Sequence, residues 1–378
     1  MKIVIAPDSY KGAMRAAKVA DTLAKAWLSI RPQDDVVTIP LSDGGEGMAD
    51  ALASACGGEF LTIPTFDALM RQITGKAVVL GSVAVLESAE ANGIERINKD
   101  ELNPMAATTF GVGVMISALL DRGCRELIIG IGGSATVDGG AGMLQALGAV
   151  FYDIDGNELP PGAGGGVLRH VAKVDFSKLD PRLAQCRIQV ACDVINPLCG
   201  VNGSAAVFGP QKGATPDMVN SLDANLLHWA ELAGDPGVIT GDGAAGGLGF
   251  ALRKILNAKL LSGAELVMKY SGFEAALPGA SLVITGEGCS DEQTVCGKLC
   301  ACVAQKAAEY HVPTVLVSGA LRGDTSALES LFCGCFSISP GAVSLEEAVA
   351  GTERNLLRMG ANLARLTVAA GSSPDQTS

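Results

Sequence analysis

The sequence predicts an α/β protein with two domains, at least one of them built on a parallel sheet. The chain has 378 residues, enough for two domains of roughly 150 residues each. Short apolar runs, each followed by a loop and a helical pattern, recur near both ends, and this alternation is typical of parallel sheets covered by helices. Glycine accounts for 48 residues, well above the average of about 7%, without a collagen period. These glycines are expected in turns and ligand-binding loops.

The N-terminal region contains two consecutive strand–loop–helix units. Residues 2–6 form an apolar run, and the helical pattern that follows has one apolar face, made by Val19, Ala20, Leu23, Ala24 and Trp27. The second unit repeats the order, with a strand at 36–41, a loop at 42–47 and a helix from 48 to 55. Two such units in succession predict a parallel sheet with right-handed crossovers.

The middle of the chain has a different pattern. Between residues 57 and 93, short alternating runs at 75–80 and 83–86 predict hairpins, and therefore a second sheet. The elements expected after them are a helix at 109–120, a strand at 126–131, a helix near 143–147, a strand at 188–192 and a longer helix at about 250–257.

The C-terminal region returns to the first pattern. Its expected elements are strands at 282–285, 314–318 and 336–339, and helices at 301–310 and 345–366. These could complete the N-terminal sheet, so we expect a discontinuous first domain at residues 1–56 plus 281–378. A second α/β domain is then inserted at 57–280. The polar tail from residue 371 is expected to fray.

Composition excludes several classes of protein. Lys and Arg total 28 against 40 Asp and Glu, a net charge of -12, which argues against a nucleic-acid surface and against a polybasic membrane anchor. The longest uncharged window, residues 102–120, contains Asn, Pro, Thr and Gly and is no membrane span. An odd number of cysteines, 11, without a signal peptide, indicates the reducing cytoplasm.

The C-x-C pairs are too incomplete to predict a zinc site. These pairs are Cys300/Cys302 and Cys333/Cys335. Neither has a second pair or a histidine nearby to complete four ligands, so buried free thiols are expected instead.

Five loops place an acidic residue beside glycine or a small polar residue at the end of a predicted strand. Their acidic residues are Asp8, Asp43, Asp138, Asp193 and Glu287, the last followed by Asp291. One such residue is more often a helix cap or turn former. Five of them in a chain with only 18% charged residues favour a metal and phosphate site at the carboxyl edge of a sheet.

Two lysines stand ahead of predicted helices. Lys11 follows Asp8-Ser9, and Lys298 follows Gly297. Free N–H groups and the helix dipole favour an anion at such positions, and an ammonium group adds a point charge. The alternative for each is a solvated surface lysine.

Two nucleotide-binding fingerprints are incomplete. Residues 130–135 fit G-x-G-x-x-A, with Asp153 or Asp155 about 20 residues further on. Glycines continue to Gly142, however, so the helix does not begin where a dinucleotide-binding unit requires. Lys298 is followed by Leu299 rather than Ser or Thr, which excludes a P-loop.

The glycine-rich and acidic segments together resemble the bacterial type I glycerate kinases, in order from Met1 to about Leu366. The segments that carry the resemblance are residues 6–12, 43–47, 130–136, 138–142, 192–193, 196–198, 208–214, 243–247 and 285–288. The resemblance implies a flavodoxin-like domain with a separate α/β domain. It also implies ATP-dependent phosphorylation of D-glycerate, usually to 2-phosphoglycerate, in small organic-acid catabolism.

The sequence departs from this family's pattern at three places. Cys289 occupies the position of a usual Arg, although Asp291 is kept. Ser281 stands where an Asp is usual, and Cys300 lies near a usual proline-containing stretch. The loss of the Arg leaves open a catalytically impaired paralogue that still binds ATP or glycerate. An oxidoreductase that uses a nicotinamide cofactor at residues 130–135 is a further alternative.

The resemblance and the loops together suggest a role for each candidate residue. Asp193 is the expected base or hydroxyl orienter, with Lys11 as the second catalytic residue. Ser9, Arg71 and Asp8 are expected to bind glycerate, and Asp43 and Glu287 to hold Mg²⁺. The residues expected to bind phosphate or nucleotide are Lys298, Gly286, Gly288, Asp291, Gly132 and Gly133. The expected ligands are therefore D-glycerate, ATP and Mg²⁺, with no nucleic acid or membrane partner, and a homo-oligomer stays open.

Overall fold

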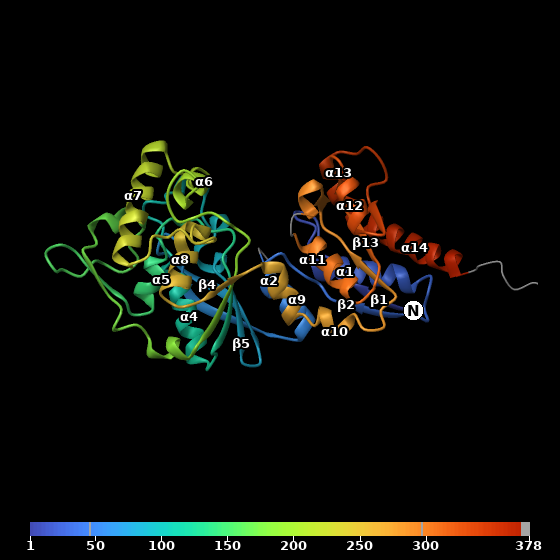
Figure 1. Ribbon diagram of the computed structural model, residues 1–378, viewed down its shortest axis with the longest axis horizontal. Coiled ribbons are helices and arrows are strands. Elements are labelled where there is room, and N and C mark those ends of the chain that lie inside the picture. The colour runs from blue at the N-terminus through green and yellow to red at the C-terminus, as the bar shows by residue number, and fades with distance from the viewer. Residues whose placement is uncertain (45–46, 296–297, 372–378) are drawn as a thin grey trace, which may run out of the picture. The chain divides into compact units, whose positions relative to one another are not determined.

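The computed structural model describes residues 1–44, 47–295 and 298–371, and its chain divides into two compact units (Figure 1). Among these residues the first unit holds 1–43, 50–57 and 264–371, and the second holds 44, 47–49 and 58–263. The expected boundary at residue 281 therefore differs from the structure, because the segment from 264 lies with the first unit. There the Cys56 thiol donates to the Tyr270 carbonyl at 2.9 Å. The tail at 372–378 lies outside the described residues.

The sheet of the first unit consists of five parallel strands in the described residues. They are β1 (Lys2–Ile5), β2 (Asp35–Thr38), β11 (Leu282–Thr285), β13 (Thr314–Ser318) and β15 (Gly334–Ser337). Their order is β15-β13-β11-β1-β2, which is 2-1-3-4-5 read from the other edge. This flavodoxin-like order reverses between β1 and β11, and in open α/β sheets ligands bind at that reversal.

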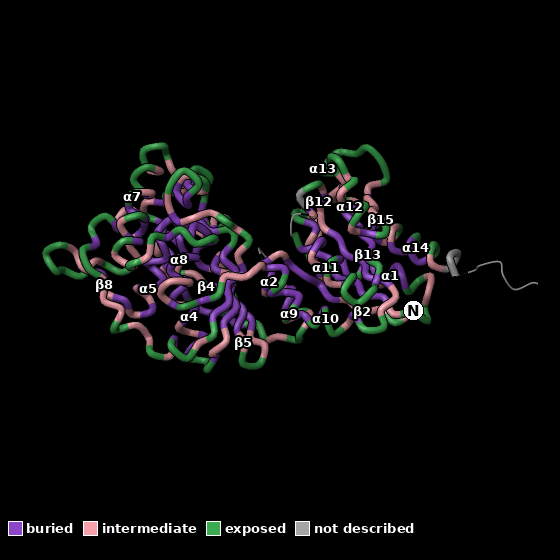
Figure 2. The backbone as a smooth tube through the Cα atoms, in the orientation of Figure 1, coloured by how far each residue is buried: buried purple, intermediate pink, exposed green. Residues whose placement is uncertain are grey.

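Helices cover both faces of this sheet. The helices that lie mainly in the first unit are α1 (Ala16–Leu28), α2 (Met48–Cys56), α9 (Gly263–Tyr270), α10 (Phe273–Ala276), α11 (Leu299–Glu309), α12 (Ser326–Leu331), α13 (Leu345–Ala350) and α14 (Thr352–Gly371). One core joins the strands to α1 and α14 through Leu23, Trp27 and Leu356. The other joins Leu316 of β13 to α11 and α12. Alternate strand residues thus face opposite helix layers. The three central strands, β1, β11 and β13, are buried apart from Lys2, whereas the edge strands β2 and β15 are only partly buried (Figure 2).

Several elements differ from those predicted in length. The helix predicted at 345–366 is two helices, because Gly351 ends α13 and a capping box at Ser344 begins it. The strand predicted at 36–41 ends at Thr38. The helix predicted at 250–257 is α8 (Leu248–Lys254), and Asn257, three residues beyond it, has a positive φ of 53°. An unpredicted helix, α7 (Pro216–Leu232), begins at its cap Thr215.

The sheet of the second unit is mixed. Its six described strands are β3 (Glu59–Phe66), β4 (Gln72–Leu80), β5 (Val83–Glu87), β6 (Glu126–Gly130), β9 (Arg187–Ala191) and β10 (Lys259–Leu261), in the order β10-β9-β6-β5-β4-β3. Antiparallel pairing joins β3 to β4 and β4 to β5, as the predicted hairpin requires, and the remaining neighbours are parallel. The carboxyl ends of β5, β6, β9 and β10 therefore lie at one edge.

A large apolar core lies between this sheet and its helices. The helices of the second unit are α3 (Ala89–Asn92), α4 (Phe110–Asp121), α5 (Ala141–Ala146), α6 (Ser204–Phe208), α7 and α8. Trp229 of α7 is fully buried in the core, where its ring packs edge-on against Phe250 at 6.4 Å between centroids. Its indole N–H donates to the Gly139 carbonyl at 3.0 Å, so the ring's polar atom is paired. Two short strands, β7 (Val150–Tyr152) and β8 (Lys173–Asp175), form a separate ribbon. Another pair, β12 (Cys289–Ser290) and β14 (Ala320–Leu321), lies in the first unit.

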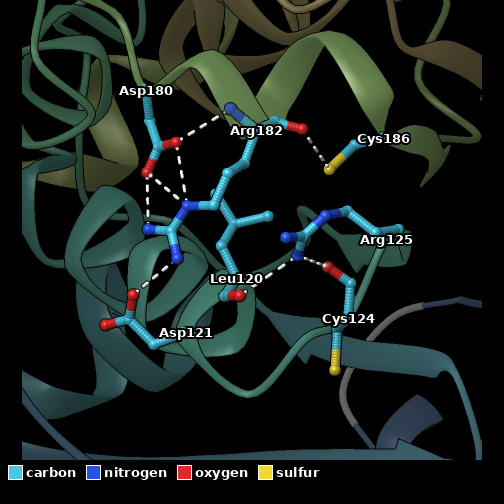
Figure 3. Close-up of polar contacts among 7 residues, drawn as sticks. All are labelled: Leu120, Asp121, Cys124, Arg125, Asp180, Arg182 and Cys186. Atoms are coloured by element: carbon cyan, nitrogen blue, oxygen red, sulfur yellow. Dashed lines mark hydrogen bonds and ion pairs between the residues drawn. The ribbon is translucent and has the colours of Figure 1, made fainter.

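An arginine network fixes the opposite, amino edge of the second sheet (Figure 3). The Arg182 guanidinium donates to Asp180 at 2.6 Å and to Asp121, the last residue of α4, at 2.7 Å. Arg125 donates to the carbonyls of Leu120 and Cys124. These contacts tie the end of α4 to the segments that enter β6 and β9. The chemistry-bearing loops lie at the other edge.

Candidate active site

The first group of candidate residues surrounds the strand reversal of the first unit. The loops after β1 and β11 lie side by side there, because the Asp8 N–H donates to the Gly286 carbonyl at 2.8 Å. A side chain at position 286 would not fit, since its Cβ would lie 1.6 Å from the Val317 carbonyl oxygen. Gly288 approaches the backbone of Lys11: a Cβ at position 288 would lie 3.2 Å from the Lys11 backbone nitrogen. Glycine thus allows the two loops to meet.

Asp8 is the buried acid of this group. Its residue is only 6% exposed, and burial, with the nearby Asp43 charge, raises the pKa of its carboxyl to about 7. A hydrogen bond from the Ser9 N–H at 2.6 Å and the Lys11 charge oppose the shift. The hydrogen bond and the lysine charge do not fully offset the cost of burying the ionised carboxylate. A cation beside Asp8 would favour its ionised form.

Lys11 pairs with Asp43 across the same group. The ammonium lies 3.3 Å from the Asp43 carboxylate, and the Lys11 side chain is 75% exposed. The Asp43 charge raises the pKa of Lys11. An exposed pair of this kind adds little stability, so its ammonium can turn to an incoming anion at small cost.

Glu287 and Asp291 continue the group along the loop after β11. The hydroxyls of Ser290 and Thr294 both donate to Glu287 Oε1 at 2.8 Å. Asp291 lies 3.7 Å from the Lys298 ammonium. Lys298 is the N-cap residue of α11 and makes no side-chain cap hydrogen bond. Gly297, which precedes it, lies outside the described residues.

The carboxylate oxygens of this group could bind Mg²⁺ if water and phosphate oxygens supply the remaining ligands. No group of three or more His, Cys, Asp or Glu side chains in the described residues could hold a metal ion by itself. Mg²⁺ usually takes one or two carboxylates and fills its remaining positions with water and phosphate oxygens. Asp43 and Glu287 can supply the carboxylates. The pKa of Asp8 is raised first by burial and then by the Asp43 charge, and a cation nearby would lower it.

The second group of candidate residues lies at the carboxyl edge of the second unit's sheet. Asp193 is exposed just after β9 and accepts a hydrogen bond from the Gly263 N–H at 3.2 Å. Gly132 and Gly133 form the exposed tip of the loop after β6. Gly44 crosses this edge with a positive φ of 85°, and a Cβ there would lie 2.5 Å from the Gly263 Cα. Gly45 and Glu46, in the same motif, lie outside the described residues.

Arg71 lies in the turn between β3 and β4, which the antiparallel register places at this same edge. Its guanidinium donates to Asp67 at 2.5 Å and to Glu101 at 3.0 Å. Two carboxylates therefore already engage the fork expected to bind an acid, and a substrate carboxylate would have to compete with them.

Asp138, one of the five loop acids, is a structural residue. It is fully buried, and it accepts hydrogen bonds from the backbone of Thr109 at 2.7 Å, Gly140 at 3.1 Å and Gly142 at 3.2 Å. Its carboxylate therefore joins the starts of α4 and α5. The helix α5 begins only at Ala141, so a dinucleotide-binding turn at 130–135 is not formed.

The structure also shows where two residues lie that depart from the family's sequence pattern, Cys289 and Cys300. Cys289 is half-buried in β12, which pairs with β14. Among the C-x-C thiols, Cys300 is buried as expected, whereas Cys333 is exposed. In the part of the chain described here, these thiols join no metal-binding cluster.

The structure also shows residues that the sequence analysis did not select. Glu87, at the end of β5, accepts hydrogen bonds from the N–H groups of Gly47 at 3.1 Å and Ala49 at 2.8 Å. Its position at a strand end was the available signal, but the hairpin pattern around it concealed that end. Lys212 lies in the segment 208–214 that carries the family resemblance, yet nothing in the sequence shows that it is buried.

Comparisons with known proteins all lead to the same family. A sequence model described as "Glycerate kinase family" matches residues 3–368. A glycerate kinase of Bacillus subtilis (strain 168) is 44% identical over 356 residues, which cover 92% of this chain and 93% of that protein. A glycerate 2-kinase of Escherichia coli (strain K12) is 42% identical over 376 residues, with 96% and 97% covered.

A solved structure shows the same fold. It is a crystal structure from Salmonella typhimurium LT2, described provisionally as glycerate kinase 2, with a TM-score of 0.90 and 40% sequence identity. The match covers 99% of this chain and 100% of that chain. Separately, no helix in the described residues is long and apolar enough to cross a membrane.

Proposed function

This chain belongs to the glycerate kinase family, and we propose that it transfers the γ-phosphoryl group of ATP to the 2-hydroxyl of D-glycerate. The products are 2-phosphoglycerate and ADP, and the reaction needs Mg²⁺. The observation that carries this proposal is the group at the strand reversal of the first unit. It combines acidic oxygens, two lysines and glycines that leave the backbone accessible.

Phosphoryl transfer needs charge stabilisation and positioning more than covalent chemistry. Mg²⁺, held by Asp43 and Glu287, would neutralise phosphate charge. Lys11 and Lys298 place their ammonium groups against phosphate oxygens. We assign phosphate or nucleotide binding also to the backbone at Gly286 and Gly288, in the first unit, and at Gly132 and Gly133, in the second. Asp291 keeps Lys298 in reach through its 3.7 Å ion pair.

The substrate side needs a proton acceptor and anchors for a small acid. Asp193 accepts the proton of the 2-hydroxyl as that oxygen bonds to the γ-phosphorus, while the bond to the ADP oxygen breaks. Its exposed carboxylate is held by the Gly263 N–H at 3.2 Å. Ser9, Asp8 and Arg71 orient glycerate, and Arg71 does so by exchanging one of its present carboxylate partners.

A coupled assay tests the reaction and its regiochemistry together. The purified chain is mixed with D-glycerate, ATP and Mg²⁺ in the presence of enolase, without phosphoglycerate mutase. Formation of phosphoenolpyruvate is expected, because enolase accepts 2-phosphoglycerate directly. Signal that appears only after the mutase is added would assign phosphorylation to the 3-hydroxyl. No ADP release with any glycerate would favour the impaired paralogue, in which Cys289 has replaced an essential Arg.

A further inference from the structure

Lys212 is a buried cation that the proposed reaction does not yet use. It ends the short 3₁₀ turn Pro210–Lys212 and is only 2% exposed. The next residue, Gly213, has a positive φ of 91°, and a Cβ there would lie 2.6 Å from the Leu102 carbonyl oxygen. The backbone therefore fixes where the lysine enters the protein. A fully buried lysine is uncommon, because desolvating an ammonium is costly.

The Lys212 ammonium group donates its hydrogen bonds to the loop that follows β6. It donates to the Ser134 hydroxyl at 2.9 Å and to the Thr136 carbonyl at 2.8 Å. Burial lowers the pKa of Lys212 to about 7, and the Asp138 charge opposes that shift. Asp138 binds the far side of the same loop, through Gly140 and Gly142. The segment from 134 to 142 is thus held by a buried cation at one end and a buried anion at the other.

The neighbouring contacts leave one part of this loop accessible. The Asn92 carbonyl accepts from the Ala135 N–H at 2.8 Å, and the Gly133 carbonyl accepts from the Ile94 N–H at 2.8 Å. Gly246 packs so closely on the Thr136 carbonyl that a Cβ would lie 1.8 Å from its oxygen. Ser134 and the residues from 135 to 142 are buried, whereas Gly132 and Gly133 are exposed. The rigid base therefore presents a glycine tip at the carboxyl edge of the sheet.

We propose that Lys212 is a positioning residue of the reaction, which holds the Gly132–Gly133 tip in the shape that receives an oxyanion of one substrate. The oxyanion is a phosphate of the nucleotide or the carboxylate of the acid. Lys212 does not touch it, because its ammonium is buried and bound to Ser134 and Thr136. The inference rests on the proposed function, in which this tip faces a substrate.

Lys212→Met tests the proposal, because methionine keeps an unbranched apolar stem and removes both donated hydrogen bonds. The KM for one of the two substrates is expected to rise roughly tenfold or more, the range for a lost hydrogen bond from a charged donor, with a smaller change in kcat. A rise in the KM for ATP assigns the tip to phosphate, and a rise in the KM for glycerate assigns it to the carboxylate. Ser134→Ala, which removes one acceptor, is expected to act in the same direction but less strongly.

A matched variant separates positioning from general destabilisation. Thr65→Val removes another buried side-chain hydrogen bond of the same unit, the 2.7 Å bond to the Gly111 carbonyl, far along the chain from the tip. It should lower the melting temperature without changing either KM. If Lys212→Met and Ser134→Ala leave both KM values unchanged, or change them no more than Thr65→Val does, the positioning role is wrong.

Ligand binding by the parent protein distinguishes a failure of this inference from a failure of the proposed function. Calorimetric titration with Mg²⁺-ADP and with D-glycerate is run on the parent, on Lys212→Met and on Ser134→Ala, which keeps the buried charge. If the parent binds neither ligand, the proposed function is overturned. If the parent binds both and the Ser134→Ala and Lys212→Met variants bind both equally well, only the role of Lys212 is overturned.

Discussion

At the scale of single residues, the candidate site depends on where each carboxylate stands relative to solvent and to cations. Asp8 is buried with a raised pKa, Asp43 pairs with Lys11, and Asp193 is exposed at the edge of another sheet. Residues of the same type thus have different chemistry because their surroundings differ. Three predictions belong to this scale.

Asp193→Asn is expected to lower kcat by roughly 10² or more, since asparagine keeps the shape but cannot accept the proton. Steady-state kinetics and a melting curve measure the two effects. The melting temperature should hardly change, because the amide oxygen can still accept from the Gly263 N–H. Unaltered kcat in a folded variant would leave Asp193 as a turn-forming residue only.

Asp8→Asn is expected to stabilise the metal-free protein near neutral pH. The folded-state pKa of Asp8, about 7, exceeds its ordinary value of 3.8, so the folded state binds the proton more tightly. The stability linked to this group is therefore full below pH 4 and falls as pH rises to 7. Removing the carboxylate should add roughly 1–4 kcal/mol at pH 8, at about 1.4 kcal/mol per pKa unit.

Urea unfolding of parent and variant between pH 4 and pH 8, in EDTA, measures this slope. Asp324→Asn is the matched control, because its exposed carboxyl has a pKa lowered by the Ser326 N–H and should not gain stability at high pH. If Asp8→Asn leaves the pH dependence unchanged, Asp8 does not titrate between pH 4 and pH 7.

Cys289→Arg is expected to improve kcat/KM by roughly tenfold, the worth of a hydrogen bond to a charged group. Arginine offers a planar fork of donors that a thiol lacks. The parent should already be active, because Lys11 and Lys298 remain as cations of the site. Turnover that appears only in the variant would establish the impaired paralogue, and lower activity in a folded variant would remove the role implied for this position by resemblance.

At the scale of elements, the site is made by the close meeting of strand ends. The loop after β11 can lie against β13 and the β1 loop only because Gly286 has no side chain. Backbone pairing alone does not build the site, since the strands would pair equally well with loops of other shapes. One prediction tests this junction.

Gly286→Ala is expected to destabilise the first unit and abolish turnover, because the new methyl group would meet the Val317 carbonyl at 1.6 Å. A few kcal/mol is the usual cost of overpacking. Melting curves and activity of Gly286→Ala and Gly341→Ala are compared, since a Cβ at Gly341 would meet nothing within 4 Å. Equal behaviour of the two variants would show that the junction adapts freely.

At the scale of the whole molecule, each unit has its own sheet and its own apolar core. A ligand of the proposed reaction that binds the folded chain should stabilise the folded state. A ligand bound only to the folded state contributes about 2.7 kcal/mol at one hundred times its dissociation constant.

Mg²⁺-ADP is expected to raise the melting temperature, and EDTA is expected to cancel most of that rise, because in the proposed reaction Asp43 and Glu287 would hold the Mg²⁺ that neutralises phosphate charge. Differential scanning fluorimetry with ADP, ADP plus Mg²⁺, and NAD measures the effect. NAD should give no rise, since the turn at 130–135 lacks the helix that a dinucleotide requires. A rise with NAD alone would restore the oxidoreductase alternative.

Much of the architecture is already determined by local patterns in the sequence. The runs at residues 2–6 and 282–285 are strands because their apolar residues are continuous, and the acids after them stand at strand ends for the same local reason. Glycine-rich segments identified the loops, since only glycine allows such close backbone approach. The family resemblance followed from the same segments and is confirmed by the family match.

The tertiary structure alone decided which of these residues meet and in what state. The strand order places the β1 loop beside the β11 loop, although they are far apart in the chain. Burial of Asp8 and Lys212, and the Glu101 carboxylate that engages Arg71, come from segments distant in sequence. Desolvation and charge pairing depend on what surrounds a group in space, and no local pattern around a single carboxylate or lysine specifies that.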